Sequence, residues 1–138
     1  MDPIPRKDDE DISLTGFNRH VGPLHRLAST PDGTERFAFT VEAKHMNASA
    51  VVHGGMLMAF IDVAMSHSAR SAAGGAALLS TVALNCDFVS PARLGDTIEA
   101  RVRVNRCTRS VVFLSGQLFA EECLLLAATG LWKIAGSR

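Results

Sequence analysis

The chain has 138 residues, and its 14 Lys and Arg residues balance its 14 Asp and Glu residues. This length suits one domain with one core, and the balanced charge argues neither for nor against a polyanionic partner. No nucleic-acid partner is expected, because the sequence has no added DNA-binding segment. The longest apolar run, Met56–Ile61, is far too short to cross a bilayer, so no membrane association is expected either.

The cysteines and the N-terminus bear on the compartment. Cys86, Cys107 and Cys123 are widely spaced and form no C-x-x-C pair, so the sequence indicates neither a zinc site nor a disulfide framework. Free thiols fit a reducing cytosol, and the charged N-terminus lacks the apolar core of a secretory signal. We therefore expect a cytoplasmic protein without a metal or cofactor.

Residues 1–13 are largely polar and predict a disordered N-terminal segment, with a single domain over 14–138. Six stretches of that domain have the apolar pattern of strands, and one long, nearly all-apolar stretch is typical of a helix. In chain order, the expected elements are a short helix end and a strand within 17–27, a strand at 35–42, a helix from about 54 to 73 and strands at 82–88, 98–104, 111–119 and 124–134.

The element order is β-β-α-β-β-β-β, which predicts an α+β domain with one helix against an antiparallel sheet. Gly74 and Gly75 are expected to end the helix, which is apolar nearly all round through Met65 and therefore reads as buried. In the strand at 82–88, alternation places four residues on one face: Val82, Leu84, Cys86 and Phe88.

The helix begins with His53-Gly54-Gly55. Backbone N–H groups at a helix start have no partner within the helix and carry partial positive charge. Because glycine lets a ligand approach closely, Gly54 and Gly55 are candidates for binding an anion or an oxyanion that forms on a carbonyl. The structural alternative is a glycine turn that only lets the loop enter the helix.

Asp62 is a single carboxylate inside this apolar helix. A buried, unpaired carboxylate is costly, which favours a functional role. The alternatives are an exposed helix stripe or a pair with an arginine. Ser66 follows one turn later on the same face and is a candidate for orienting Asp62 or contacting substrate.

The spacing of Gly54 and Asp62 constrains how they act. Eight residues of helix span about 12 Å, whereas an attacking group and the oxyanion donors must each lie about 3 Å from the same carbonyl. One helix cannot place both groups on one carbonyl. If both act together, Asp62 must come from a second copy, as in a two-fold dimer with antiparallel helices.

Positive charge gathers in one hairpin region: Arg93, Arg101, Arg103, Arg106 and Arg109. A solvated outer face is the simpler interpretation, and a clamp for a phosphorylated group is the alternative. The remaining histidines, His20, His25, His45 and His67, have no spacing typical of metal ligands.

The pattern His45-Met46-Asn47, His53-Gly54-Gly55 and Asp62 resembles the signature of hotdog-fold acyl-CoA thioesterases of the phenylacetate-pathway and 4-hydroxybenzoyl-CoA type. The run Phe88–Asp96 is similar to that family's segment after its central strand, and the likeness covers about residues 17–134. It implies the hotdog fold, a curved antiparallel sheet wrapped around one long helix, with homodimers that assemble into homotetramers.

The resemblance also implies roles. The Gly54 N–H would polarise the thioester carbonyl of an acyl-CoA substrate, Asn47 and His53 would position substrate or water, and the partner chain's Asp62 would act as general base or nucleophile. Thr81 lies where relatives often carry a Ser or Thr that holds the attacking water. Thr108 departs from the Gly found in many relatives, and Arg109 beside it would contact the coenzyme A phosphates.

Two other functions stay open at this point. A hotdog hydratase or dehydratase usually has Pro after the His-containing turn, where this chain has Gly54-Gly55. A non-catalytic acyl-CoA-binding or regulatory protein is the third reading, and Asn47, His53 and Asp62 together argue against it. The acyl group itself is not indicated by the sequence.

Overall fold

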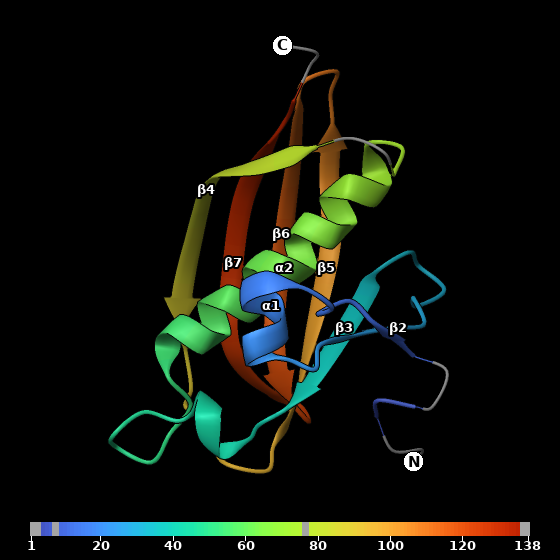
Figure 1. Cartoon of the computed structure of the whole chain (residues 1–138). Helices are drawn as coiled ribbons and strands as arrows, with labels where there is room; N and C mark the ends of the chain where they lie inside the picture. The colour runs from blue at the N-terminus through green and yellow to red at the C-terminus, as the bar shows by residue number, and fades with distance from the viewer. Residues whose placement is uncertain (1–3, 7–8, 76–77, 136–138) are drawn as a thin grey trace.

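The computed structural model describes residues 4–6, 9–75 and 78–135. One long helix, α2 (Gly54–Ala72), packs against one side of a curved antiparallel sheet whose strand order is β1-β2-β3-β5-β6-β7-β4 (Figure 1). The strands are β1 (Glu10–Asp11), β2 (His25–Leu27), β3 (Glu35–Thr40), β4 (Leu79–Phe88), β5 (Thr97–Cys107), β6 (Val111–Ala120) and β7 (Cys123–Ile134). This confirms the predicted α+β architecture.

Two shorter helical elements precede α2. The helix α1 (Gly16–Val21) lies across the side of α2 that faces away from the sheet (Figure 1). The 3-10 helix η1 (Ala43–His45) leads into the loop before α2. Within the described residues, no helix has both the length and the apolar character needed to span a membrane.

The core lies between α2 and the inward face of the sheet. The helix buries Phe60, Ile61, Ala64 and Met65 completely there. Glycine on β6 permits this close packing, since a Cβ added at Gly116 would lie 3.0 Å from Ile61 Cδ1. On the sheet side, the central strands bury five alternating residues: Phe37, Phe39, Ile98, Ala100 and Val102.

The composition of the helix predicted burial on all sides, and this prediction is wrong. Its side away from the sheet is half-exposed at Asp62, Val63 and Ser66, and Met58 is 38% exposed. The error has a physical cause. A helix face that is apolar in sequence looks the same whether it packs inside its own domain or faces outward. Asp62 thus lies on the outer stripe.

Strand β4 forms one edge of the sheet and pairs only with β7 among the described strands. A β-bulge between Thr81 and Ala83 interrupts the alternation. Val82 therefore does not share a face with Leu84, contrary to the prediction. Val82 is 58% exposed, whereas Leu84 packs against the core. The bulge inserts one residue that the partner strand does not match.

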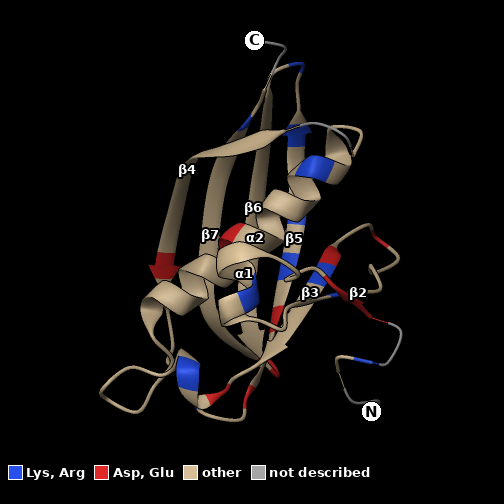
Figure 2. Cartoon of the chain, viewed as in Figure 1, with Lys and Arg blue, Asp and Glu red and all other residues tan. Residues whose placement is uncertain are grey.

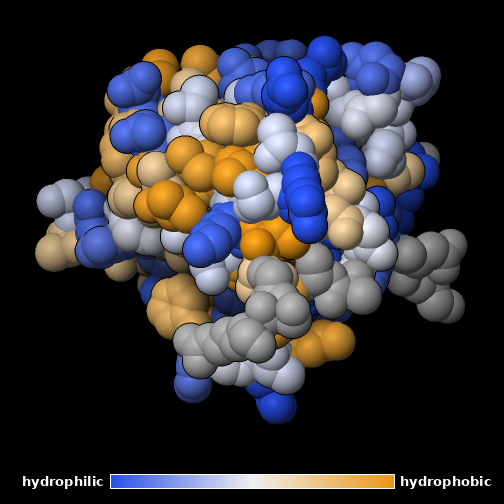
Figure 3. Space-filling model, turned by 90° about the horizontal axis from the view of Figure 1, so that it is seen from above, coloured by the Kyte–Doolittle hydropathy of each residue, from blue (hydrophilic) through white to orange (hydrophobic). Residues whose placement is uncertain are grey.

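The β4 edge is long, apolar and nearly uncharged. Asp87 is its only charged residue, near the arrowhead in Figure 2. Phe88 and the following Val89 are 53% and 55% exposed. Near the start of the strand Leu78 is 73% exposed, and the view from that end shows apolar side chains grouped among hydrophilic ones (Figure 3). An exposed edge of this kind is a template for pairing with another strand.

The outer face of the sheet carries the arginines of β5. Arg101 forms an ion pair with Glu99 at 3.0 Å, and Arg103 contacts Asp32 at 2.8 Å. Glu99 is also held by Arg36 and is only 9% exposed, so it is buried within this outer layer. These contacts favour the structural interpretation of Arg101 and Arg103.

Only part of the N-terminal segment lies within the described residues. Residues 1–3 and 7–8 of the predicted disordered segment lie outside the described residues. Further along, β1 pairs with β2, and the Ser13 hydroxyl accepts a hydrogen bond from the Leu24 N–H at 2.8 Å. The paired sheet therefore starts before residue 14, and the division into segment and domain stays a prediction.

Candidate functional site

The loop before α2 is fixed at both ends by backbone hydrogen bonds. The His53 N–H donates to the His45 carbonyl at 2.9 Å, and the Val52 N–H donates to the Ala92 carbonyl at 2.8 Å. Within the loop, Asn47 Oδ1 accepts the N–H groups of Ser49 and Val51 at 2.8 and 3.2 Å. Its oxygen therefore shapes the loop, and its amide NH₂ makes no hydrogen bond within the described residues.

The N-terminus of α2 has one amide without a partner. His53 is the N-cap residue, and its Nδ1 accepts the Gly55 N–H at 2.8 Å. The His53 carbonyl accepts from Met56 and Leu57. No hydrogen bond among the described residues uses the Gly54 N–H. Of the two predicted glycine donors, Gly54 can therefore meet a ligand, while the Gly55 N–H is already paired.

Phe88 of β4 packs against this helix start. A Cβ placed on Gly54 would lie 3.4 Å from Phe88 Cε1, so glycine leaves room here for the ring or for an approaching ligand. Since Phe88 is half-exposed, the Gly54 amide lies beside an apolar wall that is open to the surroundings. An apolar wall strengthens the electrostatic interaction of an N–H group with a developing negative charge.

Asp62 is oriented by Thr81. The Thr81 hydroxyl donates to Asp62 Oδ1 at 2.8 Å, joining α2 to the edge strand β4. Ser66, the sequence-based candidate for this task, instead accepts a hydrogen bond from the buried Trp132 Nε1–H at 2.8 Å. The second oxygen of Asp62 makes no hydrogen bond within the described part of the chain.

A cysteine also faces this carboxylate. Burial, with the Asp87 and Asp62 carboxylates nearby, raises the pKa of the Cys86 thiol. The thiol therefore stays protonated at neutral pH, and a protonated thiol is a poor nucleophile. Among the groups near Asp62, the carboxylate itself is the better base or nucleophile.

Arg109 lies far from Gly54 within one protomer. It belongs to the turn between β5 and β6, and neighbouring Cys107 contacts the Ala72 carbonyl at the C-terminal end of α2. The helix from Gly54 to Ala72 is about 27 Å long at the usual rise per residue. Arg109 is exposed, and the structure does not bring it together with the other predicted site residues.

The predicted residues thus form two groups on one helix. Asn47, His53 and Gly54 gather at its start, and Asp62 with Thr81 lies two turns further on. Because α2 is one continuous helix from Gly54, the rise between Gly54 and Asp62 is about 12 Å.

Sequence reasoning did not identify three residues that border these groups: Phe88, Trp132 and Asn18. Asn18 of α1 lines a hollow beside Asp62. Each reaches the site through packing between distant segments, which leaves no local signal in the sequence. Apolar alternation placed Phe88 on a strand face, but alternation gives no indication of a neighbouring glycine amide.

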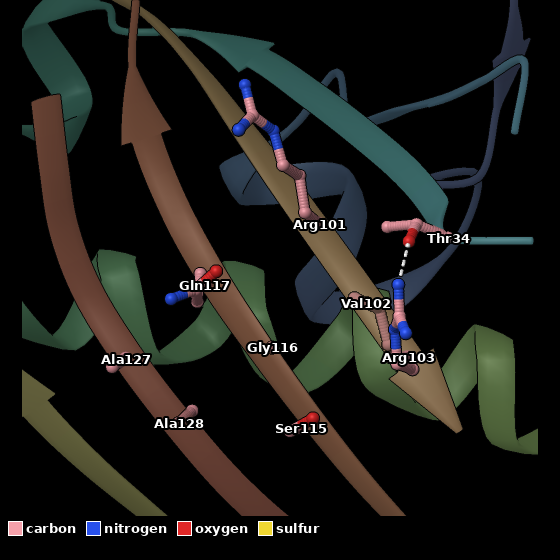
Figure 4. Close-up of a pocket in the computed structure, with 9 residues that line it drawn as sticks. All are labelled: Thr34, Arg101, Val102, Arg103, Ser115, Gly116, Gln117, Ala127 and Ala128. Atoms are coloured by element: carbon pink, nitrogen blue, oxygen red, sulfur yellow. Dashed lines mark hydrogen bonds between the residues drawn. The ribbon is translucent and has the colours of Figure 1, made fainter. Parts of the chain in front are cut away.

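Two further observations limit where a site can lie. No cluster of three or more His, Cys, Asp and Glu residues suitable for a metal occurs in the described part of the chain. A hollow of about 510 Å³ lies on the outer face of the sheet, lined by Arg101, Ser115 and Gln117, on the opposite side from α2 (Figure 4). Arg101 and Arg103 of the arginine group line it, both engaged in ion pairs, and it contains none of the residues predicted to act on the thioester.

The chain is similar in sequence to known proteins. The model of the Thioesterase superfamily matches residues 50–127. Human acyl-coenzyme A thioesterase 13 is 28% identical over 114 residues, which are 83% of this chain and 80% of that protein. The matched stretch of the family model includes His53, Gly54, Asp62 and Thr81.

Solved structures show the same fold. The conserved protein PA5202 of Pseudomonas aeruginosa superposes with a TM-score of 0.80 at 20% identity, covering 89% of this chain and 96% of that one. A mutant of the phenylacetic acid degradation protein PaaI of Thermus thermophilus gives a TM-score of 0.73 at 26% identity, covering 85% and 96%. The hotdog fold implied by the motif resemblance is confirmed.

Proposed function

Because the chain belongs to the Thioesterase superfamily, we propose that this thioester hydrolase acts on acyl-CoA, releasing the free acid and coenzyme A. The name of the related human protein supports acyl-CoA as the substrate class. The observation that carries the proposal is that one helix presents both a Gly54 amide without a partner among the described residues and the Asp62 carboxylate, which Thr81 orients.

The Gly54 N–H stabilises the oxyanion that forms on the thioester oxygen. It lies at the positive end of α2, and His53 Nδ1 already engages the next amide, so Gly54 is the donor left for substrate. The Asn47 amide NH₂ and the His53 Nε2 edge lie on the same loop and position the substrate beside it.

Asp62 supplies the attacking group in one of two ways. As a general base, it takes a proton from water while the water oxygen bonds to the thioester carbon. The tetrahedral intermediate then collapses, and the coenzyme A thiolate leaves and takes up a proton. As a nucleophile, a carboxylate oxygen attacks the thioester carbon and expels the coenzyme A thiolate, which takes up a proton. Water then cleaves the resulting anhydride to the free acid and the restored Asp62 carboxylate. The Thr81 hydrogen bond orients the carboxylate in both routes.

Two copies of the chain complete each site. The rise of about 12 Å between Gly54 and Asp62 exceeds what one carbonyl can bridge, so the Gly54 of one protomer acts with the partner's Asp62. The exposed β4 edge, with Val82, Phe88 and Val89, supports a second copy as its occupant, which would pair across a two-fold axis. Assembly of such dimers into tetramers stays a prediction.

A mixing experiment tests the shared site. Gly54→Pro removes one N–H at the first helical position, where proline is well tolerated, and His53 already has an extended ψ of 131 that suits a following proline. Asp62→Asn removes the base. Each variant alone should be inactive toward acyl-CoA, measured by release of free thiol.

Co-refolding the two variants in equal amounts forms mixed dimers with one intact site. Random pairing predicts about a quarter of the wild-type activity, because half of the dimers are mixed and each has one working site. No recovery, despite mixed dimers detected by differential affinity tags, would contradict the shared site. Full activity of Asp62→Asn would contradict the role of this carboxylate, and tight acyl-CoA binding without thiol release would contradict the hydrolase.

A further inference from the structure

A hollow of about 240 Å³ lies on the outer side of α2, next to the N-terminal segment. Asp62 of α2 forms part of its wall, together with Ile12 and Asn18 of the segment that precedes β2. Figure 1 shows α1 lying across α2 in this region. The hollow therefore opens directly beside the carboxylate assigned to the attack on the thioester.

Its size restricts what it can hold. Pockets for whole small molecules measure about 300–1,000 Å³, so this hollow suits only part of a substrate. Two groups extend from the thioester carbon beside Asp62: the acyl chain and the sulfur of coenzyme A. Coenzyme A, with its nucleotide, is far too large to enter, so the acyl chain is the part that fits.

The lining is rich in hydrogen-bond donors. Ser66 Oγ accepts the Trp132 Nε1–H, which leaves its own O–H without an acceptor among the described residues. The side chains of Asn18, His67 and Arg70 likewise make no hydrogen bond or ion pair within the described part of the chain. The single carboxylate of the hollow, Asp62, already accepts from Thr81.

Charge and apolar surface divide the hollow along the helix. Arg70 follows Asp62 by eight residues, so their backbone positions lie about 12 Å apart along the helix axis. Val63, which directly follows Asp62, and Ile12 add apolar surface to the lining. A lining with a carboxylate toward one end of the helix segment, a guanidinium toward the other and apolar side chains among them suits an acyl chain that ends in an anion.

We propose that this hollow receives the distal end of the acyl group and that the preferred substrates are acyl-CoA thioesters with a terminal carboxylate. Arg70 binds that carboxylate, and Asn18 and Ser66 donate hydrogen bonds to its oxygens. This inference rests on the proposed thioesterase function and specifies its substrate class.

The test compares two substrates that differ only at the far end. Adipoyl-CoA and hexanoyl-CoA have the same number of acyl carbons, and only adipoyl-CoA carries a terminal carboxylate. We expect kcat/KM for adipoyl-CoA to exceed that for hexanoyl-CoA by about tenfold or more, because a charge-assisted hydrogen bond is gained. Arg70→Gln should bring this ratio close to one, mainly through a higher KM for adipoyl-CoA, and Arg70→Lys should keep much of it.

Arg19→Gln is the matched control. Arg19 is an exposed arginine on α1 that does not line the hollow, so this variant should keep the wild-type ratio. A wild-type ratio near or below one, or a high ratio that survives Arg70→Gln, would overturn the inference while leaving the thioesterase function intact. Thiol release from no acyl-CoA at all would overturn both.

Discussion

Thr81 and Asp62 are joined by a hydrogen bond of 2.8 Å between the hydroxyl of an edge strand and the carboxylate of the central helix. This contact fixes one carboxylate oxygen and leaves the other for chemistry. It also links the position of Asp62 to that of β4, the strand at the open edge of the sheet.

Replacing Thr81 tests this link. Thr81→Val keeps the shape but removes the donor, so kcat should fall by about tenfold, while Thr81→Ser should retain most of the activity. Steady-state kinetics with one acyl-CoA measures both variants. Equal activity of the two variants would show that the hydroxyl does not orient the carboxylate.

Gly54→Pro and Gly54→Ala separate the amide from the added side chain. Both place a Cβ about 3.4 Å from the Phe88 ring, but only proline removes the N–H. Loss of one oxyanion donor predicts a fall in kcat of about 10²–10³ for Gly54→Pro, with a much smaller effect for Gly54→Ala. Thermal unfolding of both should stay near that of the wild type, and a similar loss of kcat in the two variants would assign the effect to crowding.

The Ser66–Trp132 contact predicts a stability effect. Trp132 is fully buried, so Ser66→Ala leaves its indole N–H without a partner and should lower the free energy of unfolding by about 1–3 kcal/mol. Urea unfolding measures this change. In a Trp132→Phe background, the same Ser66→Ala substitution should cost much less, and full additivity of the two substitutions would contradict the contact.

His67 predicts a pH dependence of stability. Burial, with the Arg26 guanidinium nearby, lowers the pKa of His67 below its usual 6.5. Between the folded and unfolded pKa values the unfolded chain binds more protons. The contribution of neutral His67 to the free energy of unfolding is therefore fully present above pH 6.5. It is lost as the pH falls through the folded pKa.

The free energy of unfolding should thus fall as the pH drops below about 6.5, and His67→Gln should reduce that fall. His20→Gln, at an exposed histidine of α1, is the matched control and should leave the fall unchanged. A pH dependence that is the same in His67→Gln and wild type would rule out this histidine as its source.

Local patterns in the sequence predicted most of the fold. Alternation located the strands, and the Gly74-Gly75 pair marked the end of α2, where both glycines have positive φ. Strand β1 escaped prediction because Glu10 and Asp11 join the sheet through their backbones, without an apolar pattern. The bulge at Val82 escaped because an extra residue in one strand is defined only by its partner strand.

The candidate site was predictable only in part. His53-Gly54-Gly55 and Asp62 stood out as unusual residue types in an apolar segment. The hydrogen bonds of Thr81 and Trp132 depend on which strands lie beside α2, and local sequence does not specify that. The half-exposed face of α2 was mistaken for core, since residue composition alone does not distinguish an apolar surface from an interior.

The bulge in β4 has a consequence for how this protein tolerates change. Thr81 and Leu84 are three residues apart, an odd spacing that would normally put them on opposite faces of a strand. The extra residue at Val82 restores them to the same face, so that Thr81 meets Asp62 while Leu84 joins the core. The position of the Asp62 carboxylate's hydrogen-bond donor therefore depends on residue parity in one strand. Inserting a residue between Thr81 and Leu84 could turn the hydroxyl away without altering any residue of the site, so relatives with length changes there cannot be compared by residue identity alone.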